Sequence, residues 1–210
     1  MGQSSSWEQQ WARRGYNPAW HVQRIPAPIR RAVEEGWFPA GSELLDIGCG
    51  SGEIAAWLAG QGFRVTGVDV APSAIDRARA AHGGQPGLAF EVADIRHATL
   101  PAGRFGSLLD RGCLHGLGRD QERYVAQIAA AAAEEARWLL LHVIRPGTSR
   151  AELIEQIGRL CRGSFHLEQI TDTVMIPGTE KSQEWPGLAF WFRRLARAAP
   201  PHPESSYPAA

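Results

Sequence analysis

The run Leu44–Gly52 (LLDIGCGSG) carries residues that could hold a charged small molecule against the backbone. An apolar stretch ends in Asp46 and Ile47, and glycines follow at alternate positions, among them Gly48 and Gly50. Alternate glycines let a backbone approach a ligand closely and adopt positive φ, and a helix that begins after them presents free N–H groups. A dinucleotide site would need a third glycine where Glu53 stands. Because this carboxylate would repel a pyrophosphate, we expect a ligand with a cationic group, a carboxylate and a ribose.

Acidic residues also end the next two apolar stretches. Asp69 ends the stretch 64–69, and Asp94 follows the stretch 88–93. A carboxylate in the place of Asp69 can accept hydrogen bonds from both ribose hydroxyls, and Asp94 could accept one from an adenine amino group. Together with the glycine run, they indicate an adenosine site.

The elements that must position these residues alternate between strand and helix. We expect helices near residues 28–35, 54–59, 72–82 and 120–136, and a further helix behind a capping box formed by Ser149 and Glu152. We expect strands over 44–47, 64–69, 88–93, 107–109, 138–144, 165–176 and 188–192. This alternation predicts an α/β fold, a doubly wound and mostly parallel sheet with helices on both faces. Such sheets bind ligands at the carboxyl ends of their strands.

Length and composition bound the remaining possibilities. The 210 residues are 44% hydrophobic and 21% charged, and 22 basic and 22 acidic residues give a net charge of zero, so nothing favours nucleic acid as a partner. Three cysteines without a C-x-x-C spacing favour a reducing compartment, and no apolar run approaches the ~20 residues that span a bilayer. We expect a cytoplasmic protein that is a monomer or weak dimer. We also expect a Trp- and Arg-rich N-terminal segment at 1–40, a main domain at 41–197 and a Pro-rich, disordered tail at 198–210.

Over residues 43–144 the sequence resembles the class I S-adenosylmethionine-dependent methyltransferases. The D-x-G-x-G-x-G run and the two acidic strand ends stand in the family's register. The resemblance implies a seven-stranded Rossmann-like sheet and S-adenosyl-L-methionine as cofactor, with S-adenosyl-L-homocysteine as product. It places Asp46, Gly48 and Gly50 around the methionine moiety, Asp69 on the ribose, and Asp94 with Ile95 on the adenine; Val70 joins the cofactor-binding residues.

A narrower similarity lies outside this core. The segment 105–112 ends in Asp110-Arg111-Gly112, as the fourth-strand segment does in thiopurine methyltransferases. Trp7-x-x-x-Trp11 followed by Trp20-His21, and the segment Trp185-Pro186-Gly187, are similar to terminal elements of that group. The group also includes thiol, halide and chalcogen methyltransferases, and in it the N-terminal element covers the donor. Trp7 and Trp11, four residues apart and therefore on one helix face, could instead be two core anchors.

The catalytic candidates are Asp110, Arg111 and His115. Asp110 follows the fourth strand and is expected beside the donor, although it could cap the following turn. Arg111 could pair with a carboxylate of the donor, of the substrate or of the protein. His115 could take a proton from an acceptor, or be a hydrogen-bonded loop residue. His142, within an apolar strand, is interpreted as a satisfied core histidine.

The resemblance and these candidates predict a methyltransferase acting on a small molecule. No cluster of residues has the spacing of metal ligands, so no metal is expected. A thiol, with a pKa of ~8.5, forms its nucleophilic thiolate with little help, whereas a hydroxyl needs a true base or a metal. Because His115 is the one candidate base, we favour a thiol sulfur as acceptor. The alternatives are an O- or N-methyltransferase that uses His115 as base, and a non-catalytic protein that binds S-adenosylmethionine.

Overall fold

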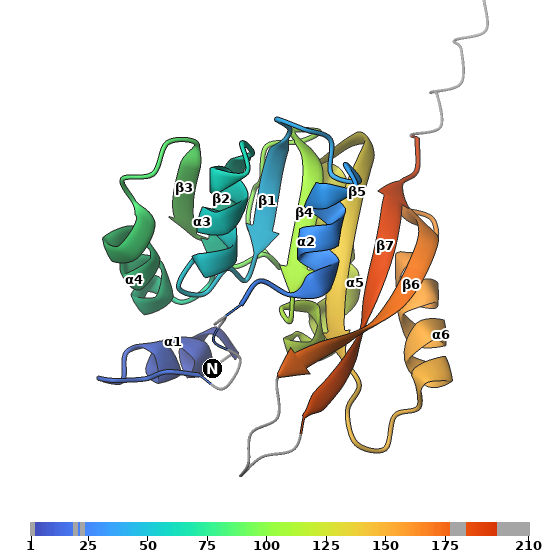
Figure 1. Ribbon diagram of the computed structural model, residues 1–210. Helices are drawn as coiled ribbons and strands as arrows, with labels where there is room; N and C mark the ends of the chain where they lie inside the picture. Colours follow the sequence, from blue (N-terminus) through green and yellow to red (C-terminus); the bar gives the residue numbers. More distant parts are fainter. Residues whose placement is uncertain (1–2, 19–20, 22–23, 177–183, 197–210) are drawn as a thin grey trace, which may run out of the picture.

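The computed structural model describes residues 3–18, 21, 24–176 and 184–196, and their strands form one seven-stranded sheet (Figure 1). The spatial order of the strands is β3-β2-β1-β4-β5-β7-β6. The strands are β1 (Glu43–Ile47), β2 (Arg64–Asp69), β3 (Leu88–Val92), β4 (Phe105–Arg111), β5 (Ala132–Val143), β6 (Phe165–Ile176) and β7 (Trp185–Arg194). The helices are α1 (Gln3–Trp11), α2 (Ala27–Glu34), α3 (Glu53–Gly60), α4 (Pro72–His82), α5 (Gln121–Ala131) and α6 (Arg150–Cys161), with two short 3₁₀ turns, η1 (Leu114–Gly116) and η2 (Gly118–Asp120).

The sheet is mixed, which corrects the expectation of a mostly parallel one. Strands β3, β2, β1, β4 and β5 pair in parallel, but β7 runs antiparallel to both of its neighbours, β5 and β6. The reason is the connection between Ile176 and Trp185, which is too short for the crossover of about a dozen residues that a parallel pair needs. Strand β7 pairs along most of its length with β5 on one side and with β6 on the other, which completes the sheet.

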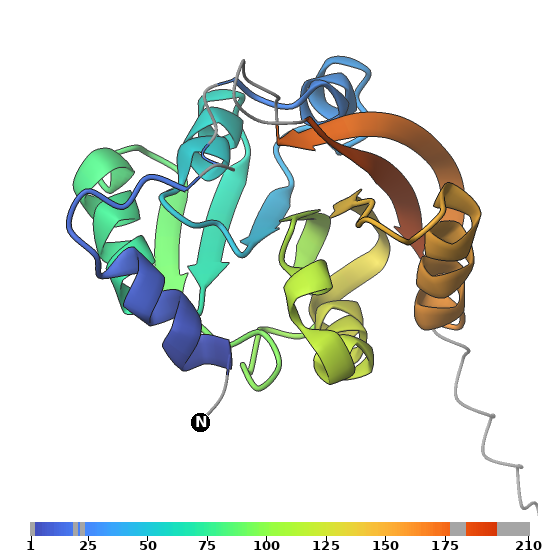
Figure 2. The same ribbon diagram turned by 90° about the horizontal axis from the view of Figure 1, so that it is seen from below.

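Helices cover both faces of the sheet, as the alternation of elements predicts (Figure 2). Successive apolar residues of a strand point to opposite faces, so Leu44 packs under one set of helices and Leu45 under the other. One core lies between the sheet and α5 and α6, and the second lies between the sheet and α2, α3 and α4. The central strands are therefore buried on both sides and held in place by two cores.

The expected helix over 120–136 is wrong at its end. Helix α5 stops at Ala131, and β5 begins at Ala132, which pairs with Phe105 of β4. The register then shifts before Ser107 pairs with Arg137, and Glu135 adopts a positive φ of 59° in this irregular stretch. Alanine favours a helix, but pairing with a buried strand outweighs that weak preference.

The other expected helices and strands are confirmed within a few residues, except that the strand expected over 138–144 begins six residues earlier, at Ala132. The capping box is confirmed as well: Glu152 N donates to Ser149 Oγ over 3.2 Å, and Ser149 N donates to Glu152 Oε2 over 2.7 Å. The expected tail at 198–210 and Trp20 lie outside the described residues.

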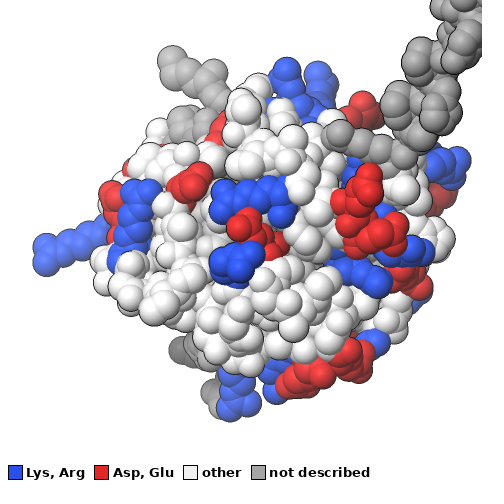
Figure 3. All heavy atoms as spheres, turned by 90° about the horizontal axis from the view of Figure 1, so that it is seen from above, with Lys and Arg blue, Asp and Glu red and all other residues white. Residues whose placement is uncertain are grey.

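Basic and acidic side chains lie next to one another on the face seen in Figure 3, around the amino ends of the parallel strands. Glu43 forms ion pairs there with Arg64 and Arg104. In the described part of the chain no helix is long and apolar enough to cross a membrane. The chemistry must be sought at the opposite end of the sheet.

Candidate functional site

A cavity of about 370 Å³ lies at the carboxyl ends of the parallel strands, on the side where α1 crosses the molecule (Figure 1). Its volume falls within the range of about 300–1,000 Å³ that is common for small-molecule sites. Residues from the ends of β1, β2, β4, β5, β6 and β7, from the segment after β3 and from α1 line it. The place agrees with the general rule for sheets of this kind.

The structure brings together eleven of the twelve residues that the sequence singled out. The cavity is lined by Trp7, Trp11, Asp46, Gly48, Gly50, Asp69, Val70, Asp94, Ile95, Arg111 and His115. Asp110 does not line it.

The glycine run bends tightly between β1 and α3. Gly48 and Gly50 have positive φ values of 71° and 56°. A Cβ at Gly48 would lie 2.9 Å from Cys113 Cβ, and one at Gly50 would lie 3.2 Å from the Trp11 ring. The amides of Gly48 and Cys49 both donate to the Val68 carbonyl. Glycine is therefore required here by backbone conformation and by close packing.

Asp46 places a buried carboxyl beneath this loop. It is 3% exposed, and its Oδ2 has no hydrogen-bond partner among the described residues. Burial, with the nearby carboxylates of Asp110 and Asp69, raises the pKa of Asp46 to about 7. A buried acceptor without a partner is costly, so this oxygen is suited to a ligand that brings a cation or a donor.

The carboxylates that end β2 and follow β3 are already partly engaged. Asp69 Oδ2 accepts from Gly50 N over 3.0 Å, and its Oδ1 accepts from Ala71 N over 2.9 Å. Burial nevertheless raises the pKa of Asp69. Asp94 accepts three hydrogen bonds from Arg96, whose side chain lowers the pKa of that carboxyl. A carboxylate offers about four lone-pair positions, so both can still accept from a ligand.

Asp110 is buried behind the cavity wall, which corrects the expectation that its side chain lies beside the donor. It is 0% exposed, and its carboxyl accepts from Cys113 N over 2.7 Å, from Leu114 N over 2.9 Å and from the Tyr124 hydroxyl over 2.5 Å. Burial raises the pKa of Asp110 to about 6, although these hydrogen bonds oppose the shift. The physical reason for its position is that the turn after β4 exposes backbone N–H groups that this side chain caps, as the alternative interpretation held.

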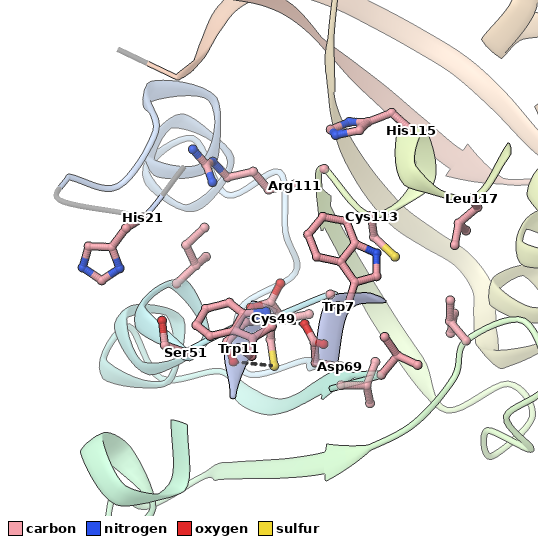
Figure 4. Close-up of a pocket in the computed structure, with 18 of the residues that line it drawn as sticks. Trp7, Trp11, His21, Cys49, Ser51, Asp69, Arg111, Cys113, His115 and Leu117 are labelled. Atoms are coloured by element: carbon pink, nitrogen blue, oxygen red, sulfur yellow. Dashed lines mark hydrogen bonds between the residues drawn. The ribbon is translucent and has the colours of Figure 1, made fainter. Parts of the chain in front are cut away.

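Arg111 and His115 lie on the wall across the cavity from Trp11 (Figure 4). An Arg111 Nη2 donates to the Met175 carbonyl over 2.6 Å, which ties the end of β4 to β6. Burial, with His142 and two arginines nearby, lowers the pKa of His115 to about 3. His115 is therefore a neutral imidazole at neutral pH and a weak base.

Helix α1 covers the near side of the cavity with two indole rings. Trp11 is 6% exposed and packs with Ala71 and Ala74, and Figure 4 shows Trp7 and Trp11 entering the cavity from α1. Glu8 lies between them in the sequence and accepts from both the amide (3.0 Å) and the hydroxyl (2.5 Å) of Ser73 at the start of α4. Arg77 of α4 donates to the Trp11 carbonyl over 2.6 Å. Polar contacts with α4 thus hold the helix in place.

Most of the apolar residues that line the cavity could not be identified from the sequence. Val143, Met175 and Ile176 line it from the ends of β5 and β6, and Leu117 lines it from the segment between the two 3₁₀ turns. Trp185 begins β7 and is 48% exposed at the rim. Nothing in the sequence marks Met175 or Ile176, because they reach the site through the strand order of the sheet.

The cysteines and histidines that line the cavity do not form a metal site; they are Cys49, Cys113, His21 and His115. Burial raises the pKa values of the Cys49 and Cys113 thiols well above their ordinary range, so both stay protonated. Within the described residues, no group of three or more His, Cys, Asp or Glu side chains could hold a metal ion. His21 lies 3.6 Å from Glu53 and ties the N-terminal segment to α3.

Comparison with known proteins agrees with this geometry. Residues 44–135 match the family model described as a methyltransferase domain. A 2-heptyl-1-hydroxyquinolin-4(1H)-one methyltransferase of Mycobacteroides abscessus is 35% identical over 127 residues, which are 59% of this chain and 55% of the relative. The chain therefore spans about half the length of this curated relative.

Solved structures share the whole fold. A protein studied for the conversion of a disulfide bond into a thioacetal group in echinomycin biosynthesis superimposes with a TM-score of 0.79, at 23% identity over 94% of this chain and 95% of that one. The N-methyltransferase NodS of Bradyrhizobium japonicum, solved with S-adenosyl-L-homocysteine, gives a TM-score of 0.70 at 19% identity, over 91% and 97% of the two chains. Residues 44–135 therefore match a methyltransferase domain, and this chain shares the fold of a methyltransferase solved with S-adenosyl-L-homocysteine.

The cavity fits the cofactor of such a domain. S-adenosylmethionine carries a sulfonium and an ammonium cation, and the cavity wall holds four carboxyl groups against two guanidinium groups, namely Asp46, Glu53, Asp69 and Asp94 against Arg96 and Arg111. Asp46 Oδ2, which has no hydrogen-bond partner among the described residues, offers an acceptor for such a cation, and the glycines let a ligand approach the backbone closely.

Proposed function

We propose that this chain transfers the methyl group of S-adenosylmethionine to the sulfur of a small aromatic or heteroaromatic thiol. S-adenosylmethionine supplies a methyl group on a sulfonium that is already a strong leaving group. The protein then has to align the acceptor with that methyl group and keep water out. The observation that carries the proposal is the weak basicity of His115 in a largely apolar acceptor wall.

In this proposal the donor lies along the carboxyl ends of β1 and β2. Asp46, Gly48 and Gly50 hold the methionine end, and Asp69 with Val70 holds the ribose. Their closeness in one cavity wall supports the assignment. Asp94 and Ile95 hold the adenine at the segment after β3, where Ile95 is buried in the core and offers an apolar surface to a flat ring.

The acceptor binds on the other side, between η1 and the ends of β5, β6 and β7. Leu117, Val143, Met175 and Ile176 make this wall apolar, and Trp185 stands at its rim. Apolar side chains exclude water and favour a flat, uncharged body. Met175 is held by Arg111 through its carbonyl, so its thioether can pack against a ring without strand β6 moving.

The acceptor atom follows from the bases at hand. With a pKa of about 3, His115 cannot hold a proton taken from a hydroxyl at neutral pH. Asp46 has a suitable pKa of about 7, but it lies under the glycine loop on the donor side. A thiol with a pKa of ~8.5 supplies some thiolate without help. Sulfur is therefore the acceptor that this wall serves best.

The test is incubation of the protein with labelled S-adenosylmethionine and a panel of aromatic thiols matched to phenols and amines of the same shape. We expect turnover of a thiol whose rate rises as the pH approaches the thiol's own pKa. His115→Ala should cost less than about tenfold, whereas loss of a true base typically costs ~10²–10⁴-fold. Methylated phenols beside inert thiols would refute the proposal.

A second candidate is O-methylation of a hydroxylated heteroaromatic ring. It is favoured by the Mycobacteroides abscessus relative, whose name gives a hydroxyquinolinone as its substrate. The same apolar wall would bind such a ring. In this case the acceptor would need a proton acceptor, so His115→Ala would abolish activity.

We further propose that residues 1–40 precede a methyltransferase domain at 41–197 and cap it through α1, with Trp7 and Trp11 covering the donor, while α2 packs in the core of the domain. The contacts of α1 with α4 and the position of both indoles in the cavity wall support this assignment. Trp7→Ala should leave the melting temperature within a few degrees and weaken S-adenosylhomocysteine binding in calorimetry. Unchanged binding would show that the tryptophans only pack.

A further inference from the structure

A second histidine, His142, lies directly behind His115. It belongs to β5 and is 6% exposed, and the centroids of the two imidazole rings lie 5.2 Å apart at an interplanar angle of 74°. The sequence predicts a satisfied core histidine here, and this prediction is only half right. Its Nδ1 lies 2.8 Å from the Val143 carbonyl oxygen, but its Nε2 is buried and has no partner in the described part of the chain.

The protonation state of His142 follows from its one hydrogen bond. A carbonyl oxygen can only accept, so Nδ1 carries the hydrogen. Burial lowers the pKa of His142, which keeps the ring neutral at neutral pH. Its Nε2 is therefore a lone pair that can only accept, and leaving it without a donor is costly.

His115 has the complementary need. Its Nδ1 is also buried and lacks a partner among the described residues, while its ring reaches the cavity (Figure 4). Gly112 leaves room beside the ring, because a Cβ there would lie 3.1 Å from His115 Cε1 and 3.7 Å from Nε2. Two neutral neighbours thus each hold one unsatisfied nitrogen, and of the pair only His115 can donate.

We propose that His115 donates Nδ1–H to His142 Nε2 in the donor-bound enzyme, so that His142 fixes His115 as the tautomer whose Nε2 offers a lone pair to the methyl acceptor. The ring separation leaves room for one N–H···N bond of about 3 Å. Rotation about the last side-chain torsion of histidine is soft, so the rings can turn to meet.

The consequence concerns how the acceptor is held, and it rests on the proposed function. With a lone pair at Nε2, His115 accepts a hydrogen bond from an O–H or N–H elsewhere on the acceptor's ring and leaves the thiolate sulfur free. The other tautomer would direct an N–H at the attacking atom and tie up the electron pair that has to reach the methyl group. His142 is thus a positioning residue that acts through His115, and the acceptor class is a ring that brings a hydrogen-bond donor.

Histidine tautomers can be read directly from long-range ¹H–¹⁵N NMR spectra of the ¹⁵N-labelled protein with S-adenosylhomocysteine bound. We expect both His115 and His142 as Nδ1–H tautomers. His142→Asn keeps a donor near Nδ1 but loses the acceptor, so His115 should shift toward the Nε2–H form. His142→Gln puts an amide oxygen near the place of Nε2 and should restore the Nδ1–H form. The matched control is His166→Asn, an exposed histidine of β6, which should change neither ring.

Turnover gives an independent arm. His142→Asn should lower kcat by roughly threefold, within the loss of less than about tenfold expected for His115→Ala and far below the ~10²–10⁴-fold of a lost base. Affinity for S-adenosylhomocysteine should be unchanged, and His142→Gln should restore kcat. An Nε2–H His115 in the unaltered protein, or the same tautomer in both variants, would overturn the proposal. If no thiol is methylated, the proposed function fails, while the spectra still decide the histidine pair. Should either variant fail to bind S-adenosylhomocysteine, the spectrum of the unaltered protein alone decides.

Discussion

Replacing Asp46 by asparagine should stabilise the free protein above pH 7 and weaken its hold on S-adenosylmethionine. The carboxyl of Asp46 is 3% exposed, and its Oδ2 lacks a partner among the described residues. Burial comes first among the causes that raise its pKa to about 7, and the neighbouring carboxylates of Asp110 and Asp69 follow. Asparagine keeps the shape of the side chain and removes the buried charge.

The sign and size follow from linkage. In the unfolded chain the carboxyl has its ordinary pKa of 3.8, and in the folded chain about 7. Between these values the folded state keeps a proton that the unfolded state has lost, so the free energy of unfolding falls by about 1.4 kcal/mol for each pH unit. From pH 5 to pH 7 this single group therefore costs on the order of 2–3 kcal/mol. Above pH 7 the loss levels off.

The assay is urea unfolding of the wild type and Asp46→Asn at pH 5, 6, 7 and 8, without donor. The difference between the two proteins should shift in favour of the variant as the pH rises, because every other titrating group is common to both. Wild-type affinity for S-adenosylmethionine should rise from pH 6 to pH 8, since a cation favours the ionised carboxyl, and the variant should lack this rise. Parallel pH curves of unfolding, or a variant less stable at pH 8, would refute the reasoning.

Three further substitutions separate binding from folding. Asp69→Ala should weaken S-adenosylhomocysteine binding in calorimetry by roughly 1–3 kcal/mol through lost charge-assisted hydrogen bonds, whereas Asp76→Ala, at an exposed position of α4, should leave binding unchanged. Asp110→Ala should lower the free energy of unfolding by about 3 kcal/mol or more, because three donors lose their acceptor; an intact melting curve with lost binding would contradict this structural role. Glu8→Gln should weaken donor affinity only by roughly threefold, since a partly buried charged contact near the surface contributes about 1 kcal/mol or less, and limited proteolysis should cut α1 faster.

The sequence predicts that the glycine loop and the strand-end carboxylates lie close together, and they line one cavity wall because local chemistry dictates their positions. Glycine is the residue that adopts the positive φ of positions 48 and 50 without a steric penalty. A carboxylate at the end of a parallel strand, such as Asp69, reaches the same edge of the sheet in any α/β fold. The positions of these residues can therefore be predicted from the local sequence alone.

The acceptor wall could not be predicted in the same way. Met175 reaches the cavity because β6 and β7 form the far edge of the sheet, and that strand order depends on pairings between segments far apart in the chain. The position of Asp110 was predicted wrongly for a related reason. The sequence pattern of an acidic residue at a strand end is the same whether its side chain faces a ligand or caps the next turn. The deciding donors include the hydroxyl of Tyr124, fourteen positions further on.

Helix α1 shows how a contact distant in sequence can link folding to closure of the site. Helix α4 begins after Ala71, which has no side-chain oxygen with which to cap the exposed N–H groups of its first turn. Glu8 supplies that acceptor from α1, and a carboxylate at a helix N-terminus also meets the positive end of the helix dipole. The same helix turn carries Trp11, whose indole ring lies so close to Gly50 that a Cβ there would be 3.2 Å from it. Covering the donor cavity therefore satisfies a need of α4 that exists before any donor binds, so the helix is held over the site in the free protein.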